Sequence, residues 1–588
     1  MTDEPAPSLD SPDDATGGAT RDPVSETAQA PAMASDDDGT AAVGPRRGRW
    51  AAMPFIALGV AMIIVDATIV NVAIPSIQRD IGLTVPDAEW VTSLYSLVFA
   101  SLLLTTGRIG DIVGRKRIFV IGVVVFVLAS MVAAASHWVD SVPLLIAGRF
   151  LQGIGGAMIL PASLSTVNAM YHGKDRAIAF AIWGSTIGGT AALGPLLGGW
   201  LTTTFGWEYA FLINLPIGLL ILFGLWRYVP ETRDPHTRRG VDVPGTLLSI
   251  VGLAALVFGL IEGQRYGWWK ATQEFSAFGV KWPLTSLAPS AVAFVLFAVC
   301  AVAFIVVERH RARAGRIVLL DFSLFTVLSF RYGNIAALIV SLGEFGLLFA
   351  LPLFLQSILG YSAFDTGLVL LSLAVGTLIA SPLAAQIAVR RGGRTVVRLG
   401  MLLEIVGIVG IGIVVSPTAT GWTFVPWLLV YGMGVGLATA QLTGVVMADI
   451  PVSESGQGSA VQSTSRQVGA ALGTAILGAV LVVSLGHGIT SRLVDQGVPQ
   501  ATAEQVASVI KNAPTVLAAP ATGVPGQPTI SAVERTVAGE AFAASIRDVA
   551  WVAAGWILLG LIATLLLPRE RVHDPPPERS ATAGAATG

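Results

Sequence analysis

Long apolar runs are the feature that most constrains how this chain can fold. Runs of about 20 apolar residues recur between residues 50 and 567, and a helix of about that length crosses the hydrocarbon core of a bilayer. Composition agrees, because only 13% of the 588 residues are charged, whereas soluble domains carry about 25%. The sequence therefore predicts an all-α polytopic membrane protein and argues against a soluble protein of two or three domains.

Fourteen candidate spans follow from the positions of these runs. They are rich in glycine and proline, which transmembrane helices tolerate because neighbouring helices satisfy the freed backbone groups. The spans are expected near residues 50–75, 90–107, 117–136, 143–168, 177–201, 207–228, 243–263, 286–307, 333–356, 365–389, 397–416, 424–447, 464–486 and 549–567. An even number of spans predicts that both termini lie on the same side of the membrane.

Basic residues predict which side that is, because they occur in alternate loops. Short loops at 137–140, 202–206 and 416–421 contain no lysine or arginine. The basic clusters precede the first span or follow an even-numbered one: Arg46, Arg47, Arg49, Arg115, Lys116, Arg117, Lys174, Arg176, Arg233, Arg238, Arg239, Arg309, Arg311, Arg313, Arg316, Arg390, Arg391 and Arg394. Since positive loops stay in the cytoplasm, we expect a multi-pass protein of the plasma (inner) membrane with both termini cytoplasmic.

Three polar segments fall outside the expected spans. Residues 1–49 are rich in Asp, Glu, Pro, Ala and Ser, without the apolar core of a signal peptide, and they are expected to be a disordered cytoplasmic tail, as are residues 568–588. Residues 487–548 form a long extracellular insertion, with helical patterns at 501–511 and 530–546. This insertion is either a surface cap or a lid that influences the substrate.

Several classes of function are disfavoured by what the sequence lacks. A net charge of −2 gives no basic excess for nucleic acid, and the single Cys300 forms no disulfide within the chain. Gly173-Lys174 is followed by Asp175 rather than by Ser or Thr, so no phosphate-binding loop for ATP is present. No His/Cys cluster suggests a metal, and no Ser/His/Asp grouping suggests an enzyme. We therefore expect no cofactor, no metal and no catalytic residue.

One loop, between the second and third spans, combines glycines with charges at close spacing. In Gly107-Arg-Ile-Gly-Asp111-Ile-Val-Gly114-Arg115-Lys-Arg117, the glycines allow helix ends to approach closely. Asp111 can accept hydrogen bonds from a helix N-terminus and pair with Arg115. Such a cluster could hold two helix bundles together in one conformation and release them in another. Topogenic charge alone would explain the arginines but not the glycines and the aspartate.

Charged residues inside the expected spans form a second set of candidates. A charge at mid-bilayer costs about 2.5–3.5 kcal/mol on insertion scales, so each one suggests a function. Asp66, Arg149, Glu344 and Glu404 all lie within spans. Burial makes the carboxyls candidates for reversible protonation, whereas a purely structural role would be an ion pair or hydrogen bond between helices. Arg466 is expected to be a boundary residue that snorkels to the cytoplasmic interface.

The loop resembles the signature of the major facilitator superfamily, G-x-x-x-D-x-x-G-R-K-x. Further segments resemble its fourteen-span drug:proton antiporter family, at residues 66–75, 149–161, 194–199 and 207–218, and more weakly at 351–356. The sequence departs from the family pattern at Ile112, Glu208, Tyr209 and 390–394. The last of these is only a degenerate copy of the loop, so the first half is expected to supply most of the cytoplasmic latch.

The resemblance implies a major facilitator fold of two six-helix bundles plus two extra helices. The bundles would occupy residues 50–228 and 333–567, and the extra pair, in 229–332, would lie peripherally. Proton coupling would involve Asp66, where the family's first-helix motif lies, and Arg149, which resembles the family's buried arginine. Glu344 would be a second proton site or a contact for cationic substrate.

The remaining candidates, apart from the charged Glu404, lie in segments that carry the same resemblance. Gly194, Pro195, Gly198 and Gly199 look like the antiporter signature, whose bend is thought to seal against leak; plain close packing is the alternative. Polar side chains expected near the substrate cavity are Asn71, Gln152, Asn214, Gln356 and Glu404.

The function expected is proton-coupled efflux of small hydrophobic or cationic compounds, with a broad, multidrug range. The partners would be the substrate, protons and the lipid bilayer, with no ATP, and the protein would be monomeric. A dedicated exporter of one metabolite, antibiotic, siderophore or lipid remains open. A non-transporting receptor or scaffold is less favoured, because it would need neither Asp66 nor Arg149. Uptake by symport is also less favoured, because residues 194–199 look like the antiporter signature.

Overall fold

The protein is helical over nearly all of the chain that the computed structural model describes. The described residues are 46–82, 85–191, 193–232, 240, 242–277, 280–283, 286–451, 454–512 and 532–566. The predicted tails, 1–49 and 568–588, lie outside them, apart from the few residues from Arg46 onward that begin the first helix.

Thirteen described helices are long and apolar enough to cross a membrane. The predicted span at 177–201 is formed by two shorter helices, α5 (Gly173–Ala191) and α6 (Leu193–Thr204). Counted together, these two complete the fourteen predicted spans. The all-α polytopic architecture predicted from the apolar runs is therefore confirmed.

The first group of helices owes its close packing to glycines on α3 and α4. A Cβ on Gly155 of α4 would lie only 2.7 Å from the backbone nitrogen of Phe126 on α3, so only glycine allows this approach. Beyond these two, α1 packs against α5, α6 and α8, and α2 against α4. The bounds are α1 (Arg46–Ile81), α2 (Val85–Val113), α3 (Arg115–Ala135), α4 (Val142–Met170), α7 (Tyr209–Leu212) and α8 (Asn214–Tyr228).

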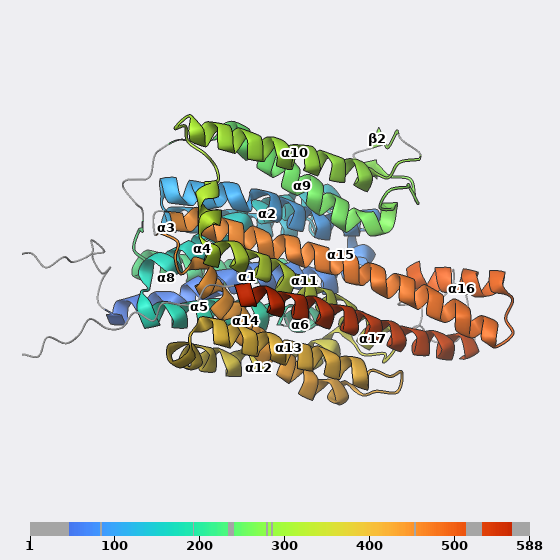
Figure 1. Ribbon diagram of the computed structural model, residues 1–588. Helices are drawn as coiled ribbons and strands as arrows, with labels where there is room; N and C mark the ends of the chain where they lie inside the picture. The colour runs from blue at the N-terminus through green and yellow to red at the C-terminus, as the bar shows by residue number, and fades with distance from the viewer. Residues whose placement is uncertain are drawn as a thin grey trace, which may run out of the picture. The chain divides into compact units, whose positions relative to one another are not determined.

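An additional hairpin of two long helices follows, α9 (Val243–Tyr266) and α10 (Pro289–Arg313). Their connection contains the short strands β1 (Ser276–Ala277) and β2 (Val280–Lys281), which pair antiparallel. The two helices lie together along one side of the bundle, with α10 outermost (Figure 1). Val299 and Val302 of α10 are 60% and 63% exposed, which suits a helix facing lipid. The inner helix α9 packs against α2 and α15.

The second group of helices begins with a 3-10 turn, η1 (Phe322–Thr326), and ends with another, η4 (Thr564–Leu566). Within it, α13 and α12 pack on α14, and α11 packs on α15 and α17. The bounds are α11 (Leu328–Ser357), α12 (Ala363–Arg391), α13 (Gly393–Val414), α14 (Gly421–Met447), α15 (Ser455–Asp495), α16 (Gln500–Asn512) and α17 (Ala532–Ala563). Contacts between the two groups run from α2 to α15, and from α5 and α6 to α12.

Within its described residues, 487–512 and 532–548, the predicted insertion is mostly an extension of two spans. Helix α15 continues to Asp495, α17 already begins at Ala532, and α16 lies beside their far ends (Figure 1). This confirms the helices expected at 501–511 and within 530–546. Ala503, Ala507 and Ile510 of α16 are buried, so α16 is attached to the bundle through an apolar face. Residues 513–531 lie outside the described residues, and the cap or lid role stays a prediction.

Candidate functional site

Asp66 and Arg149 form a buried ion pair between α1 and α4. An Nη1 atom of Arg149 lies 2.6 Å from Oδ2 of Asp66, and both side chains are almost completely inaccessible. Arg149 also donates from Nε to the carbonyl of Val91, at 2.9 Å. The structure therefore brings together the two residues that the resemblance assigns to proton coupling, and it anchors the arginine to a third helix, α2.

Polar side chains complete the hydrogen bonding of this pair. Gln152 and Asn214 each donate to Oδ1 of Asp66 at 2.8 Å. The same two amides also donate to the hydroxyl of Ser130, at 2.7 and 3.1 Å. Every oxygen of the Asp66 carboxylate thus has a donor, which offsets much of the cost of burying the charge. We call Asp66, Arg149, Gln152, Asn214 and Ser130 the first cluster.

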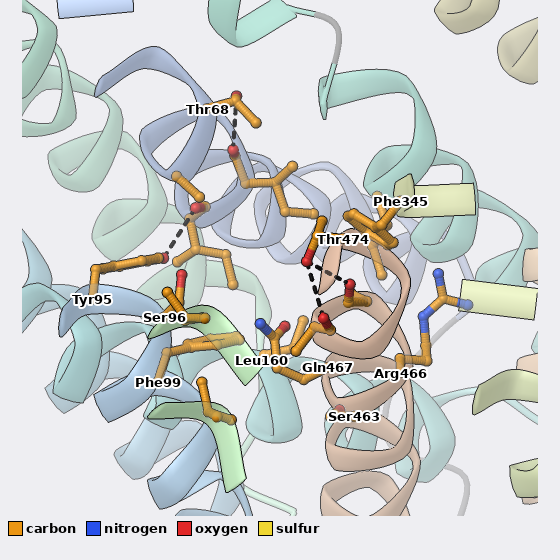
Figure 2. Close-up of a pocket in the computed structure, with 18 of the residues that line it drawn as sticks. Thr68, Tyr95, Ser96, Phe99, Leu160, Phe345, Ser463, Arg466, Gln467 and Thr474 are labelled. Carbon is orange, nitrogen blue, oxygen red and sulfur yellow. Dashed lines mark hydrogen bonds between the residues drawn. The ribbon is translucent and has the colours of Figure 1, made fainter. Parts of the chain in front are cut away.

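A cavity of about 340 Å³ lies between the two groups of helices. Helices α1, α2, α4, α5, α9, α11 and α15 all contribute to its wall. The lining includes four aromatic residues and several hydroxyl or amide groups, some of which Figure 2 shows around the hollow: Thr68, Tyr95, Ser96, Phe99, Trp183, Phe345, Ser463, Gln467 and Thr474. Its size and mostly apolar wall match those of small-molecule binding sites.

Helix α9 lines this cavity, which departs from the expectation that both extra helices lie peripherally. Val257 and Ile261, one turn apart, both face it. The expectation holds for α10 alone. Apolar residues at a helical spacing are expected on every buried or lipid-facing span, so nothing in the sequence distinguished the face of α9 that reaches the cavity.

Tyr95 connects the cavity to the first cluster. Its ring lines the cavity, and the Cζ atom of Arg149 lies 4.3 Å from the ring centroid, within the range of a cation–π contact. The Tyr95 hydroxyl donates to the carbonyl of Ile63 on α1, at 3.1 Å (Figure 2). A molecule in the cavity can therefore contact the aromatic ring on which the coupling arginine rests.

Glu344 belongs to a second cluster of buried charges, in the second group of helices. Its Oε2 lies 3.7 Å from Nη2 of Arg466, and its Oε1 accepts a hydrogen bond from Thr439 at 3.1 Å. Glu404 is fully buried nearby, where the charges of Glu344 and Arg466 act on it, and neither of its carboxyl oxygens has a hydrogen-bond partner among the described residues. We call Glu344, Arg466, Thr439 and Glu404 the second cluster.

The expectation that Arg466 snorkels to the interface is wrong. The side chain is only 9% exposed and lines the cavity. Hydropathy placed the start of this span at 464, but α15 begins at Ser455. All residues from Ser455 to Ser463 are buried, although most of them are polar or glycine. The apolar signal therefore begins well after the helix does, and Arg466 lies deeper than its position in the apolar run suggests.

The glycine-rich segment predicted as a loop forms the last turns of α2 and the start of α3, with only Gly114 between the two helices, and it makes the contact expected of a latch. Asp111 accepts hydrogen bonds from the backbone nitrogens of Gly456 (3.0 Å) and Gln457 (3.1 Å), in the first turn of α15. Arg115 lies 3.2 Å from the same carboxylate. A carboxylate at a helix N-terminus is favoured by the free N–H groups and the helix dipole. Asp111 therefore joins the first group of helices to the second.

Two glycines make room for this contact. A Cβ on Gly107 would clash with the Cβ of Ala460 and lie 2.7 Å from the carbonyl oxygen of Gly456. Gly114 has a positive φ of 120°, and a Cβ there would lie 2.6 Å from the carboxyl group of Glu231. Arg117 lies 3.8 Å from this same carboxylate. Glu231 was not predicted as part of the latch, because only the folded chain brings it back to the loop.

The latch region also contains a carboxyl group with an altered acidity. Burial raises the pKa of Glu454, the residue immediately before α15, and the nearby carboxylate of Asp321 adds to this rise, while Arg108 opposes it. Near the start of α15, the hydroxyl of Ser459 also donates to the carbonyl of Pro161 on α4, at 3.1 Å. Several contacts therefore hold the start of α15 against the first group.

The glycines of the predicted antiporter helix place α6 against helices of both groups. A Cβ on Gly194 would clash with the Thr68 hydroxyl of α1, and one on Gly198 would lie 3.0 Å from the carbonyl of Ile69. On the other side of α6, a Cβ on Gly199 would lie 3.4 Å from the backbone nitrogen of Phe364 in α12. Pro195, in the first turn of α6, follows the break between α5 and α6, where a proline costs no helical hydrogen bond.

The expected substrate-cavity residues lie in different places. Gln152 and Asn214 belong to the first cluster and Glu404 to the second, and none of the three lines the cavity. Gln356 is half-buried near the end of α11 and is also absent from the lining. Asn71 lies on α1, but its side chain is outside the described residues. The cavity wall was missed because apolar and hydroxyl residues of seven helices carry no motif.

The sequence pattern of the Major Facilitator Superfamily matches residues 56–474. This chain belongs to that superfamily. It is 33% identical over 502 residues to the probable actinorhodin transporter of Streptomyces coelicolor, covering 83% of this chain and 82% of that protein. It is 31% identical to the multidrug resistance protein Stp of Mycobacterium tuberculosis H37Rv, covering 77% and 79% of the two chains.

Solved structures agree on the fold. The human organic anion transporter MFSD10 superposes on this major facilitator with a TM-score of 0.52 at 14% identity, covering 89% of this chain and 100% of that one. Identity at this level shows a shared fold alone. The major facilitator fold predicted from the sequence motifs is confirmed.

Proposed function

We propose that this major facilitator is a proton-coupled efflux transporter that exports small hydrophobic or cationic compounds by alternating access. The observation that carries the proposal is the place of Tyr95, whose ring both lines the cavity and supports Arg149, the partner of Asp66. Substrate in the cavity and a proton on Asp66 can thereby influence each other across one aromatic ring. Relatives named as a transporter and as a multidrug resistance protein support the direction of transport.

In this proposal Asp66 binds a proton when the substrate leaves the cavity and releases it when the substrate binds. Protonation removes the negative charge that Arg149 holds, so the arginine is free to shift on Tyr95 and weaken substrate contacts. Loss of the proton restores the ion pair. Glu344 is a second carboxyl that can take part, because it too is buried beside an arginine.

The driving force is sufficient for useful efflux. One proton moving through about 100 mV gives about 2.3 kcal/mol, and one pH unit adds about 1.4 kcal/mol. Together these sustain a gradient of roughly several hundred-fold. For a monovalent cation exchanged for one proton the voltage term cancels, and the limit falls to about tenfold. A second proton, carried on Glu344, would restore the voltage term.

The latch would set which face of the cavity opens. With Asp111 on the first turn of α15, the end of the bundle that carries the basic loops is held together. Breaking these two hydrogen bonds would allow that end to separate while α6 and α12 remain in contact. The glycines of α6 would then serve as a pivot and a seal.

Several finer features belong to the same proposal. The transporter would work as a monomer in the plasma membrane, with both termini cytoplasmic and without ATP or catalysis of its own. Its two moving units would be residues 50–228 and 333–567, with the pair in 229–332 between them. A dedicated exporter of a single compound is the second candidate, since one relative is named for a single compound, actinorhodin.

The test is transport by purified protein in liposomes under an imposed pH gradient. Dyes of different charge, including ethidium, rhodamine 123 and fluorescein, would be offered to wild type, Asp66→Asn and the matched control Asp80→Asn, which lies on the same helix. We expect gradient-driven transport of at least one dye by wild type and Asp80→Asn, and at least a tenfold loss in Asp66→Asn. Undiminished transport by Asp66→Asn would refute its role, and no gradient-driven transport of any dye by wild type would refute broad efflux.

A further inference from the structure

Arg466 is the only charged side chain among the described residues that line the cavity. It rises from α15 on the same side of the cavity as Phe345 (Figure 2). No aspartate or glutamate belongs to the described lining, so the wall offers a positive charge and no carboxylate with which to bind a cation.

The guanidinium group has hydrogen-bonding capacity to spare. Its Nη1 atom is buried and has no hydrogen-bond partner within the described part of the chain, and burying such a donor without a partner is costly. Its ion pair with Glu344 is long, at 3.7 Å, compared with 2.6 Å between Arg149 and Asp66. Glu344 also accepts a hydrogen bond from Thr439, and it lines a small adjoining pocket instead of the main cavity. A ligand oxygen can therefore bind Arg466 without first breaking a strong ion pair.

The Asp66 carboxylate is not available to a cation in the cavity either. Asp66 accepts hydrogen bonds from Arg149, Gln152 and Asn214, and the Tyr95 ring stands between Arg149 and the cavity. A cationic molecule in the cavity would meet Arg466 before it met an unoccupied carboxylate, and like charges at close range repel.

The rest of the wall suits a flat aromatic molecule. Tyr95, Phe99, Trp183 and Phe345 offer ring faces for stacking. Hydroxyl and amide groups on α15, from Ser463, Gln467 and Thr474, lie along the same helix as Arg466 (Figure 2). The volume of about 340 Å³ accommodates a compound of three or four fused rings by order of magnitude.

We propose that Arg466 is a specificity-determining residue that binds an acidic or electron-rich oxygen of the substrate, and that the cavity prefers neutral or anionic polycyclic aromatic compounds to cations. This proposal rests on the proposed function and revises its substrate class, because it keeps the hydrophobic compounds but puts anions in the place of cations. Because Glu344 competes with the substrate for the guanidinium group, removing the Glu344 carboxylate should strengthen the binding of anions.

The test compares two dyes that share a tricyclic xanthene scaffold but differ in charge, fluorescein (anionic) and rhodamine 123 (cationic). Binding to the purified full-length protein would be measured by fluorescence polarisation at one neutral pH. We expect wild type to bind fluorescein at least about tenfold more tightly than rhodamine 123. Tighter binding of rhodamine 123, equal affinities, or binding of neither dye would overturn the proposal.

Three variants and one control variant test whether Arg466 causes the preference. Arg466→Gln should lose most of the preference for fluorescein, whereas Arg466→Lys should keep part of it. Arg492→Gln is the control, because it removes an arginine of the same helix that pairs with Glu540 in a half-exposed position. Glu344→Gln should raise the affinity for fluorescein several-fold, a gain that misfolding cannot mimic. Unchanged preference in Arg466→Gln, or weaker fluorescein binding by Glu344→Gln, would contradict the proposal.

The same dyes separate this proposal from the proposed function. If liposomes transport rhodamine 123 or ethidium under a pH gradient while fluorescein neither binds nor moves, efflux stands and the charge preference fails. If fluorescein binds with the expected dependence on Arg466 but no dye moves under a pH gradient, the cavity assignment stands and coupled efflux fails.

Discussion

The two clusters of buried charge differ in how completely they are hydrogen-bonded. In the first cluster, Asp66 has an arginine at 2.6 Å and two amide donors at 2.8 Å. In the second, Glu344 lies 3.7 Å from its arginine, and both oxygens of Glu404 have no hydrogen-bond partner among the described residues. One helix group thus contains a well-satisfied ion pair, and the other contains two ionisable groups, Arg466 and Glu404, with buried atoms that lack a hydrogen-bond partner among the described residues.

This difference suggests a division of labour. A satisfied ion pair has one favoured geometry, which suits a site that must return to the same state after every proton exchange. Groups with unused donors and acceptors can rearrange around a bound substrate with little loss of free energy. The first cluster, which does not line the cavity, fits proton coupling, and the second, which reaches the cavity through Arg466, fits substrate recognition.

The largest expected effect is the loss of stability when the arginine of each cluster is replaced in turn. Arg149→Gln leaves a buried carboxylate without its counter-charge, which typically costs about 3–5 kcal/mol. Arg466→Gln should cost less than half as much, because its ion pair is longer and less hydrogen-bonded. Denaturant unfolding of the purified variants measures both costs. Equal losses would show that the two clusters are not bonded differently after all.

The latch between the helix groups gives the next largest effect. Gly107→Ala places a methyl group against Ala460 and the Gly456 carbonyl, whereas an equivalent methyl on Gly110 meets no atom of the described chain within 4 Å. We expect Gly107→Ala, but not Gly110→Ala, to open the basic end of the bundle. The reporter is maleimide labelling of Ser463→Cys in a Cys300→Ser background, several-fold faster from that end in Gly107→Ala. Identical labelling of the two variants would count against the latch.

Replacing Glu404 should change stability by a smaller amount, and it tests whether the second cluster contains a carboxyl group without hydrogen-bond partners. Because both carboxyl oxygens lack partners among the described residues, Glu404→Met should stabilise the protein by about 1–2 kcal/mol. Substrate affinity should change by less than about twofold, since Glu404 does not line the cavity. Thermal unfolding and dye binding measure the two quantities. A destabilised variant would mean that the carboxyl group has a stabilising role in the second cluster.

The smallest effect is the pH dependence of stability that comes from Asp80, at the C-terminal end of α1. The indole of Trp207, which donates to Asp80 at 2.7 Å, is the main cause that lowers the pKa of Asp80, and His137 contributes. A lowered pKa stabilises the fold above the ordinary Asp value of about 3.9 and loses that effect as pH falls through the lowered value.

Since Asp80 is 41% exposed, its contribution should stay below about 1 kcal/mol. Asp80→Asn should therefore be slightly less stable than wild type at pH 6, and the two proteins should become equal in stability once the pH has fallen below the lowered pKa of Asp80. Thermal unfolding of both proteins across this range measures the difference. A gap that persists at low pH would assign the stabilisation to something other than the ionised carboxylate.

Much of the fold and of the first cluster could be predicted from sequence, whereas the second cluster was predicted only in part, through Glu344 and Glu404. Apolar runs indicate spans, and family motifs contain Asp66, Arg149 and Asp111, whose partners then meet in the fold. The depth of Arg466 was missed because the buried polar residues that begin α15 carry no apolar signal. Glu231 and Tyr95 were missed because their roles depend on contacts between residues far apart in the chain.

The account's central claim is that a proton on Asp66 and a substrate in the cavity exclude each other. The most direct measurement is proton release when saturating dye binds to purified protein in weakly buffered solution, repeated at falling pH, because the ion pair with Arg149 favours the ionised carboxylate. We predict that release by wild type rises towards about one proton per dye as the pH falls, whereas Asp66→Asn, which is neutral like the protonated carboxyl group, should bind dye more weakly and release almost no protons. Binding without proton release by wild type at every pH, or unchanged release by Asp66→Asn, would contradict the claim.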